Sequence, residues 1–144
     1  MSNKIDSFKG EFAFLSNFFP ANIVMEDGIW YPTTEHAFQA FKTLDMADRE
    51  RIAKLATPGK SKRAGREVVL RNDWELVKMD VMRECIRRKF SHGSELAQKL
   101  IATGDAELIE GNNHGDRIWG VCDGEGKNLL GILLMEQRAT LKSV

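Results

Sequence analysis

The segment Trp74–Phe90 constrains the fold most, because it is the longest amphipathic stretch of the chain. Its apolar residues recur at helical spacing, which predicts a helix that buries one face. These residues are Val77, Val81, Cys85 and Ile86. A buried face must pack against other elements, and 144 residues are enough to build a core around it. We therefore expect a fold in which helices dominate.

Local signals predict the other helices. We expect them at Tyr31–Lys42, Asp45–Ala56, Ser61–Leu70, Glu95–Ala102 and Asn128–Leu141. Pro32 and the two threonines after it can cap the first of these helices. Thr57-Pro58-Gly59 is expected to stop the second, and Gly104 to end the fourth.

The expected β structure is small. Asp27-Gly28 lies between the apolar runs Ile23–Met25 and Ile29–Tyr31, which is a strong signal for an antiparallel hairpin. Leu108–Glu110 is expected to form a strand, and the polar residues Ser2–Lys9 a loose start.

The expected fold class is therefore α+β: a mainly helical single domain with a small antiparallel β element near the N-terminus. Neither a linker nor an internal repeat divides the sequence, so the domain is expected to cover residues 1–144, with a core at about 12–141. The hydrophobic content of 42% is ordinary for a globular protein.

Charge and residue counts exclude several classes of function. The 21 basic and 21 acidic residues cancel, which argues against strong non-specific binding to nucleic acid. No apolar run reaches the ~20 residues of a membrane span, and no leader is expected. Only two cysteines are present, which favours a reducing cytoplasm. The three histidines are scattered, so we expect neither a metal site nor a cofactor.

A polar stripe lies on the helix predicted at Tyr31–Lys42. At ~100° per residue, Glu35, Gln39 and Lys42 fall on one side of the helix, with Phe38 and Phe41 to either side. A polar stripe of this kind often faces water. The alternative is that a carboxylate, an amide and an ammonium group line one cavity.

A second polar segment, Glu110–Gly120, contains Asp116 and Trp119. Asparagine and glycine turns favour a solvated loop, but a tryptophan in such a loop must bury itself or stack on another group. Trp74, at the start of the longest helix, can be an ordinary core anchor.

Five segments together resemble the YbiA-like family, also called NADAR. They are Phe14–Phe18; Tyr31–Lys42; Trp74 with Met82 and Lys89-Phe90; Thr103-Gly104-Asp105 with Glu110; and Asp116–Gly120 running into Gly126–Gly131 and Arg138. The resemblance covers nearly the whole chain, roughly Phe12 to Leu141.

The resemblance implies an N-glycosidase that uses no metal. Its implied substrates are phosphoribosylamino-pyrimidine intermediates of the riboflavin pathway, with ADP-ribosylated guanine as the alternative. Carboxylates suit this reaction, since the sugar becomes oxocarbenium-like. We assign Glu35 as general base or oxocarbenium stabiliser and Asp116 as the second carboxylate.

Binding roles follow from the same resemblance. Trp74 and Trp119 would flank the base, and Asn17 would bind the edge of the base or of the sugar. A phosphate would contact cations. The cationic candidates are Lys42, Lys62, Arg63 and Arg66, and Gln39, Glu110, Asn128 and Arg138 are expected to complete or support the pocket.

Two other classes of function stay open at this point. The same pocket can bind ADP-ribose or a nucleotide without cleaving it. Alternatively, Cys122 can act as a nucleophile with His114 as its base. The oligomeric state cannot be read from the sequence.

Overall fold

A computed structural model describes residues 3–143, which group into two compact units. One unit contains the described residues of Met1–Ser16 and Phe90–Val144, and the other is the continuous segment Asn17–Lys89. The boundaries after Ser16 and Lys89 coincide with no linker in the sequence. Each unit is described by itself. The fold class is α+β, as predicted.

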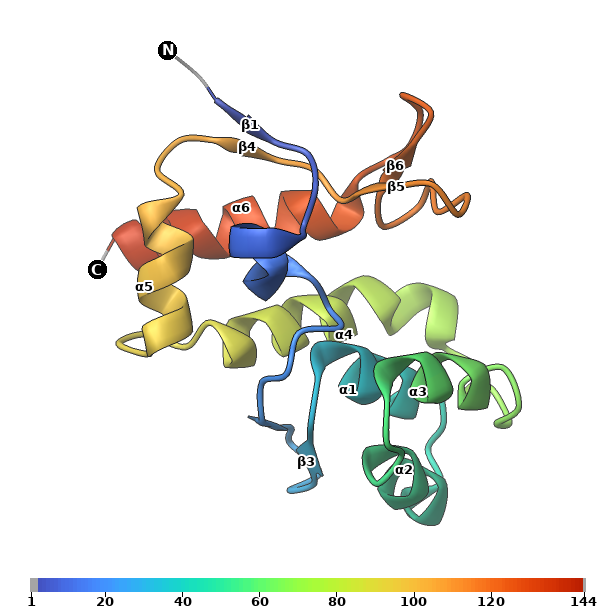
Figure 1. The fold of residues 1–144 in the computed structure, drawn as a ribbon. Helices are drawn as coiled ribbons and strands as arrows, with labels where there is room; N and C mark the ends of the chain where they lie inside the picture. The colour runs from blue at the N-terminus through green and yellow to red at the C-terminus, as the bar shows by residue number, and fades with distance from the viewer. Residues whose placement is uncertain (1–2, 144) are drawn as a thin grey trace. The chain divides into compact units, whose positions relative to one another are not determined.

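The Asn17–Lys89 unit consists of a hairpin and four helices. In chain order its elements are β2 (Ile23–Val24), β3 (Trp30–Tyr31), α1 (Thr34–Ala40), α2 (Met46–Ala53), α3 (Pro58–Ala64) and α4 (Trp74–Lys89). Helix α1 packs against β3, α2, α3 and α4 (Figure 1). All seven of its residues are buried, so α1 forms the centre of this unit.

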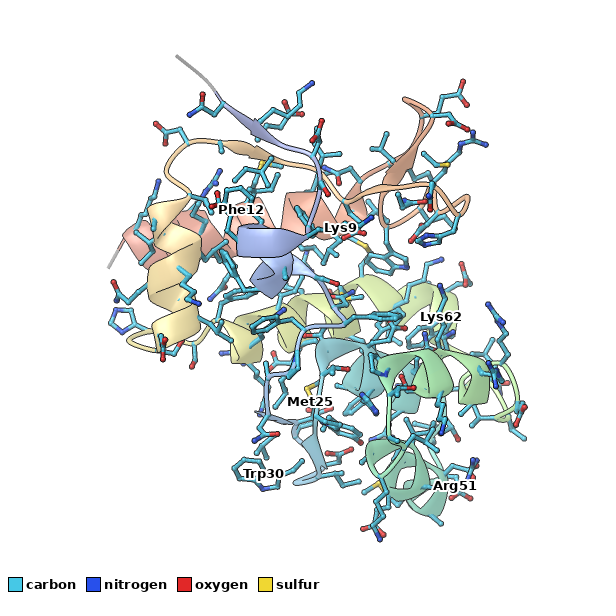
Figure 2. All side chains as sticks on the ribbon, in the orientation of Figure 1. Lys9, Phe12, Met25, Trp30, Arg51 and Lys62 are labelled. Carbon is cyan, nitrogen blue, oxygen red and sulfur yellow. The ribbon has the colours of Figure 1, made fainter. Side chains whose placement is uncertain are left out.

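The hairpin predicted from Asp27-Gly28 is present, with β2 and β3 antiparallel. Asp27 holds its turn: Oδ1 accepts from the backbone N–H of Ile29 at 3.0 Å, and Oδ2 from the Tyr31 hydroxyl at 2.7 Å. Arg49 of α2 adds a buried ion pair to Oδ2 at 3.3 Å. Burial and the Asp27 carboxylate both raise the pKa of Tyr31. By contrast, Trp30 on the same hairpin is 65% exposed (Figure 2).

The predicted threonine cap of α1 is confirmed at Thr33. Its Oγ1 accepts from the backbone N–H of His36 at 3.0 Å and lies 2.7 Å from His36 Nδ1. His36 Nε2 lies 3.0 Å from the carbonyl oxygen of Leu55. Because a carbonyl only accepts, Nε2 carries the proton and Nδ1 accepts from the Thr33 hydroxyl. Burial lowers the pKa of His36, consistent with a neutral ring that has a structural role.

Helix α4 follows the prediction closely, but Val77 is half-buried instead of buried. Val77 lines a surface hollow of about 400 Å³, so one side of the Val77 side chain is open to solvent.

The boundaries predicted for α3 were wrong. The helix covers Pro58–Ala64 and not Ser61–Leu70, because Thr57 accepts from the backbone N–H of Lys60 at 3.1 Å and Pro58 takes the first helical position. The Thr57-Pro58-Gly59 stop signal thus begins a helix, while α2 ends earlier, at Ala53.

The other unit contains two parallel strand pairs and three helices. Its elements are β1 (Lys4–Ile5), the 3₁₀ helix η1 (Gly10–Leu15), α5 (Glu95–Ala102), β4 (Glu107–Leu108), β5 (Gly111–Asn112), β6 (Val121–Cys122) and α6 (Leu129–Lys142). Strand β1 pairs with β4, and β5 with β6 (Figure 1). Helix α6 packs on α5 and β4.

The loose start predicted at Ser2–Lys9 was therefore wrong, since Lys4 and Ile5 pair with Glu107 and Leu108. Ser2 itself lies outside the described residues. The strand predicted at Leu108–Glu110 is shifted by one residue at its start and ends at Leu108. None of the helices in the described part of the chain combines the length and hydropathy that crossing a bilayer requires.

We expect Asp27→Asn to lower the free energy of unfolding by about 3 kcal/mol. An amide nitrogen in place of Oδ2 cannot accept from Tyr31 or Arg49, which leaves a buried guanidinium group without its carboxylate. Urea unfolding measures this loss. Asp80→Asn is the matched control, because its side chain is 76% exposed in an ion pair with Arg83 and should change stability by less than about 1 kcal/mol. Equal losses in the two variants would contradict the prediction.

Candidate active site

Glu35 is a carboxylate on a buried helix, with only 8% of the residue exposed. Its backbone N–H donates to the carbonyl oxygen of Asn17 at 3.0 Å. One turn later, Gln39 Nε2 donates to Glu35 Oε2 at 2.6 Å. The i, i+4 spacing on α1 therefore brings the amide onto the carboxylate and orients it.

Lys42 joins these two residues, although α1 ends at Ala40. Burial is the main cause that lowers the pKa of Lys42. The positive charges of Arg66 and Lys62 lower it further, whereas the negative charge of Glu35 raises it. Lys42 is thus within electrostatic range of one carboxylate and two cations. The structure brings Glu35, Gln39 and Lys42 together, but the hollow of about 400 Å³ in this unit is lined by other residues.

The basic residues of α3 are not equivalent. Lys62, labelled in Figure 2, is half-buried and acts on Lys42, as does Arg66 just beyond the helix. Arg63 and Arg66 are both exposed, but the charges that lower the pKa of Lys42 are those of Arg66 and Lys62.

Two further predicted residues support α1. Trp74 is 6% exposed and packs on Phe38, with ring centroids 5.1 Å apart. Trp74 is therefore a core anchor in this structure, and its stacking on a base stays a prediction. Asn17 is half-buried, with its Nδ2 3.7 Å from the sulfur of Met82 on α4.

Helix α4 adds two buried groups to this region. The negative charge of Glu35 contributes to raising the pKa of the Cys85 thiol, after burial and Glu84. One turn later lies Lys89, which is 5% exposed, and burial lowers its pKa to about 7. Its ammonium group is 5.7 Å from the centroid of the Phe19 ring. Lys89 belongs to one of the five family segments and no role was predicted for it, although a lysine in phase with the apolar stripe of Cys85 indicates an unusual environment.

Glu110, Asp116, Trp119 and Asn128 belong to the other unit. Asp116 shapes its loop, because Oδ1 accepts from the backbone N–H groups of Ile118 at 3.1 Å and Trp119 at 2.9 Å. The side chain of Asn112 stabilises the same loop, because its Nδ2 donates to the carbonyl oxygen of Asp116 at 2.9 Å. Trp119 is half-buried. The catalytic role of Asp116 and the stacking role of Trp119 stay predictions.

Both ends of the Asn128 carboxamide have structural partners. Nδ2 donates to the carbonyl oxygen of Leu108 and Oδ1 accepts from the backbone N–H of Glu110, each at 2.9 Å. Asn128 has a φ of 53°, which asparagine tolerates better than most residues. It thus ties the segment after β4 to the start of α6. Arg138 is also engaged structurally, since Nη1 donates to Thr103 Oγ1 at 2.8 Å.

The alternative nucleophile finds little support. Cys122 is buried, with its thiol 3.8 Å from the Asp123 carboxylate, while His114 is exposed on its loop. Across residues 3–143, no three His, Cys, Asp or Glu side chains are arranged to hold a metal ion.

The sequence and the structure of this chain are both similar to those of known proteins. The NADAR domain matches residues 6–142. N-glycosidase YbiA of Shigella flexneri is 44% identical over 126 residues, which are 85% of this chain and 78% of that protein. A riboflavin biosynthesis protein of Vibrio vulnificus is 39% identical over 132 residues, 90% of this chain and 35% of that protein. The solution structure of Escherichia coli YbiA superposes with a TM-score of 0.85 at 41% identity, covering 99% of this chain and 88% of that one.

We expect the stability of the protein to carry a pH dependence from Lys89. Its pKa is lowered to about 7 in the folded chain, whereas an unfolded lysine titrates near ~10.4, so the unfolded chain binds more protons between these values. The unfolding free energy of the wild type should therefore rise with pH from about 7 to about 10, and Lys89→Met should lose this rise.

Urea midpoints measured across this pH range test the prediction. Lys54→Met is the control, because Lys54 is exposed at the end of α2. A Lys89→Met protein with the same pH slope as the Lys54→Met protein would show that Lys89 does not titrate as proposed.

Proposed function

The chain belongs to the NADAR domain family, and on that premise we propose that it is a hydrolase that cleaves the carbon–nitrogen bond between a base and ribose. The proposed substrate is a phosphoribosylamino-pyrimidine intermediate of riboflavin biosynthesis, the pathway named for its Vibrio vulnificus relative. The observation that carries the proposal is the buried Glu35 carboxylate. Gln39 orients it, and its charge acts on Lys42, as do the charges of Arg66 and Lys62.

The proposed chemistry needs a carboxylate at the anomeric carbon. As the bond to the base breaks, the sugar acquires oxocarbenium character, which a negative charge stabilises. A carboxylate can also take a proton from the attacking water, whose oxygen bonds to the anomeric carbon, while the departing nitrogen takes up a proton. The 2.6 Å contact with Gln39 holds the Glu35 carboxylate in place before substrate arrives.

The proposed phosphate contacts come from Lys42, Lys62 and Arg66. The charges of Lys62, Arg66 and Glu35 all act on Lys42, so carboxylate and cations are within electrostatic reach of Lys42 in this unit. A ribosyl phosphate carries its phosphate and its anomeric carbon on the same sugar. This arrangement supports a small phosphorylated metabolite as substrate.

Base release identifies the substrate. The wild-type protein is offered a phosphoribosylamino-pyrimidine and, separately, ADP-ribosylated guanosine, each with and without a chelator. We expect release from the first substrate, unchanged by the chelator. Faster release from the second substrate would show that the protein removes ADP-ribose from guanine instead. Binding without release, measured by calorimetry, would identify a binding module and refute the hydrolase.

We expect Glu35→Gln to lower the rate of base release by about 10²- to 10⁴-fold, because the amide neither takes a proton nor stabilises positive charge. The amide oxygen can still accept from Gln39, so the fold should persist, as circular dichroism and thermal unfolding can verify. Glu50→Gln is the control, an exposed glutamate on α2 of the same unit. Near-normal turnover by Glu35→Gln would remove Glu35 from the mechanism.

We expect Lys62→Met to raise the KM for the phosphorylated substrate by about tenfold, the loss of one charge-assisted contact. Arg63→Met should leave KM within about twofold, since Lys62 and Arg66 are the neighbours whose charges lower the pKa of Lys42. With the dephosphorylated substrate the two variants should be equal. A larger rise of KM in Arg63→Met than in Lys62→Met would show that the phosphate binds at Arg63, on another face of α3.

A further inference from the structure

We propose that Gly65 is a positioning residue for the reaction, because the absence of a side chain at Gly65 lets the Gln39 carboxamide reach Glu35. The inference rests on the function proposed above for Glu35. It concerns the residue that directly follows α3, which neither the sequence motifs nor the polar contacts single out.

The backbone does not require glycine at this position. Gly65 follows the last residue of α3 with φ −61° and ψ −21°, right-handed helical values that any L-residue adopts. Gly104, just after α5, differs in this respect, because its φ is +67°. The reason for a glycine at position 65 therefore lies outside its own backbone.

The reason is the space that Gln39 occupies. A Cβ atom on Gly65 would lie 1.9 Å from Gln39 Oε1, 2.9 Å from its Cδ and 3.3 Å from its Cβ. The first two distances are far inside van der Waals contact, so the carboxamide and a methyl group cannot share the position. Gln39 thus fits against the bare backbone of Gly65.

Shape, and not hydrogen bonding, holds this end of the carboxamide. Gln39 is 4% exposed, and its Oε1 has no hydrogen-bond partner among residues 3–143. The other end donates from Nε2 to Glu35 Oε2. The carboxamide is therefore confined between Gly65 and Glu35. A methyl group at position 65 would push it away, and Glu35 would lose an oriented donor.

Gly65→Ala tests the inference, with Gly59→Ala as the matched control. Gly59 lies in the first turn of α3, the helix that Gly65 follows, and the nearest atom to its Cβ would be Thr57 Oγ1 at an ordinary 3.9 Å. We expect Gly65→Ala to lower kcat by about 10- to 100-fold, with KM within about twofold, since misplacing a catalytic group slows the reaction more than it weakens binding. Gly59→Ala should match the wild type.

A double-mutant cycle separates positioning from general damage to the fold. Once Gln39→Ala has removed the carboxamide, only the 3.3 Å contact with the Cβ of residue 39 remains, so Gly65→Ala has no amide to displace and should lower kcat no further. An equal loss of kcat in both backgrounds, or wild-type kcat in Gly65→Ala alone, would overturn the inference.

The side-chain ¹⁵N–¹H signals of Gln39 give a readout that needs no turnover. They should shift in Gly65→Ala and stay unchanged in Gly59→Ala, and an unshifted signal in Gly65→Ala would overturn the inference whatever the activity. Failure of the wild type to release base from either substrate would instead refute the proposed function, which keeps the two failures distinct.

Discussion

The Asn17–Lys89 unit depends on a helix that is buried on every side although four of its seven residues are polar. Burial of polar groups is costly unless they find hydrogen-bond partners, so α1 depends on the pairs that its side chains make. His36 pairs with Thr33 and Leu55, and Glu35 pairs with Gln39. These contacts fix the helix, and β3, α2, α3 and α4 are then positioned against it.

Buried polar groups in this unit fall into two kinds. The Asp27 carboxylate is matched at both oxygens by Ile29, Tyr31 and Arg49, and the result is a closed turn with a structural role. The Gln39 carboxamide is matched at one end only, within residues 3–143. Imperfect satisfaction of a buried group costs stability, and such groups are typical of functional sites more than of scaffolds. This contrast supports the assignment of chemistry to the Glu35 region and of structure to Asp27.

Local signals predicted the cap at Thr33, the turn at Asp27-Gly28 and the extent of α4 and α5, because each depends on residues a few positions apart. They could not predict that Lys4 pairs with Glu107, since that partner is distant in sequence. The stripe of Glu35, Gln39 and Lys42 could be placed on one face because these residues are close in sequence. Spacing along the chain could not show which basic residues act on Lys42. Those cations belong to the region around α3, a helix whose start was itself misplaced by the interpretation of Thr57-Pro58-Gly59 as a stop.

The family resemblance gave Asn128 a place in the pocket, which stays a prediction, and in the structure its carboxamide ties Leu108 and Glu110 to α6. Gly65 shows the converse, a residue with no polar group that is tied to the candidate chemistry by the space it leaves. A glycine in a sequence can satisfy either a backbone conformation or a neighbour's volume, and the two requirements look identical until φ is known. At Gly65 the backbone is ordinary and the neighbour is Gln39. We therefore attribute the glycine to the volume of the Gln39 carboxamide, which in turn donates to the Glu35 carboxylate.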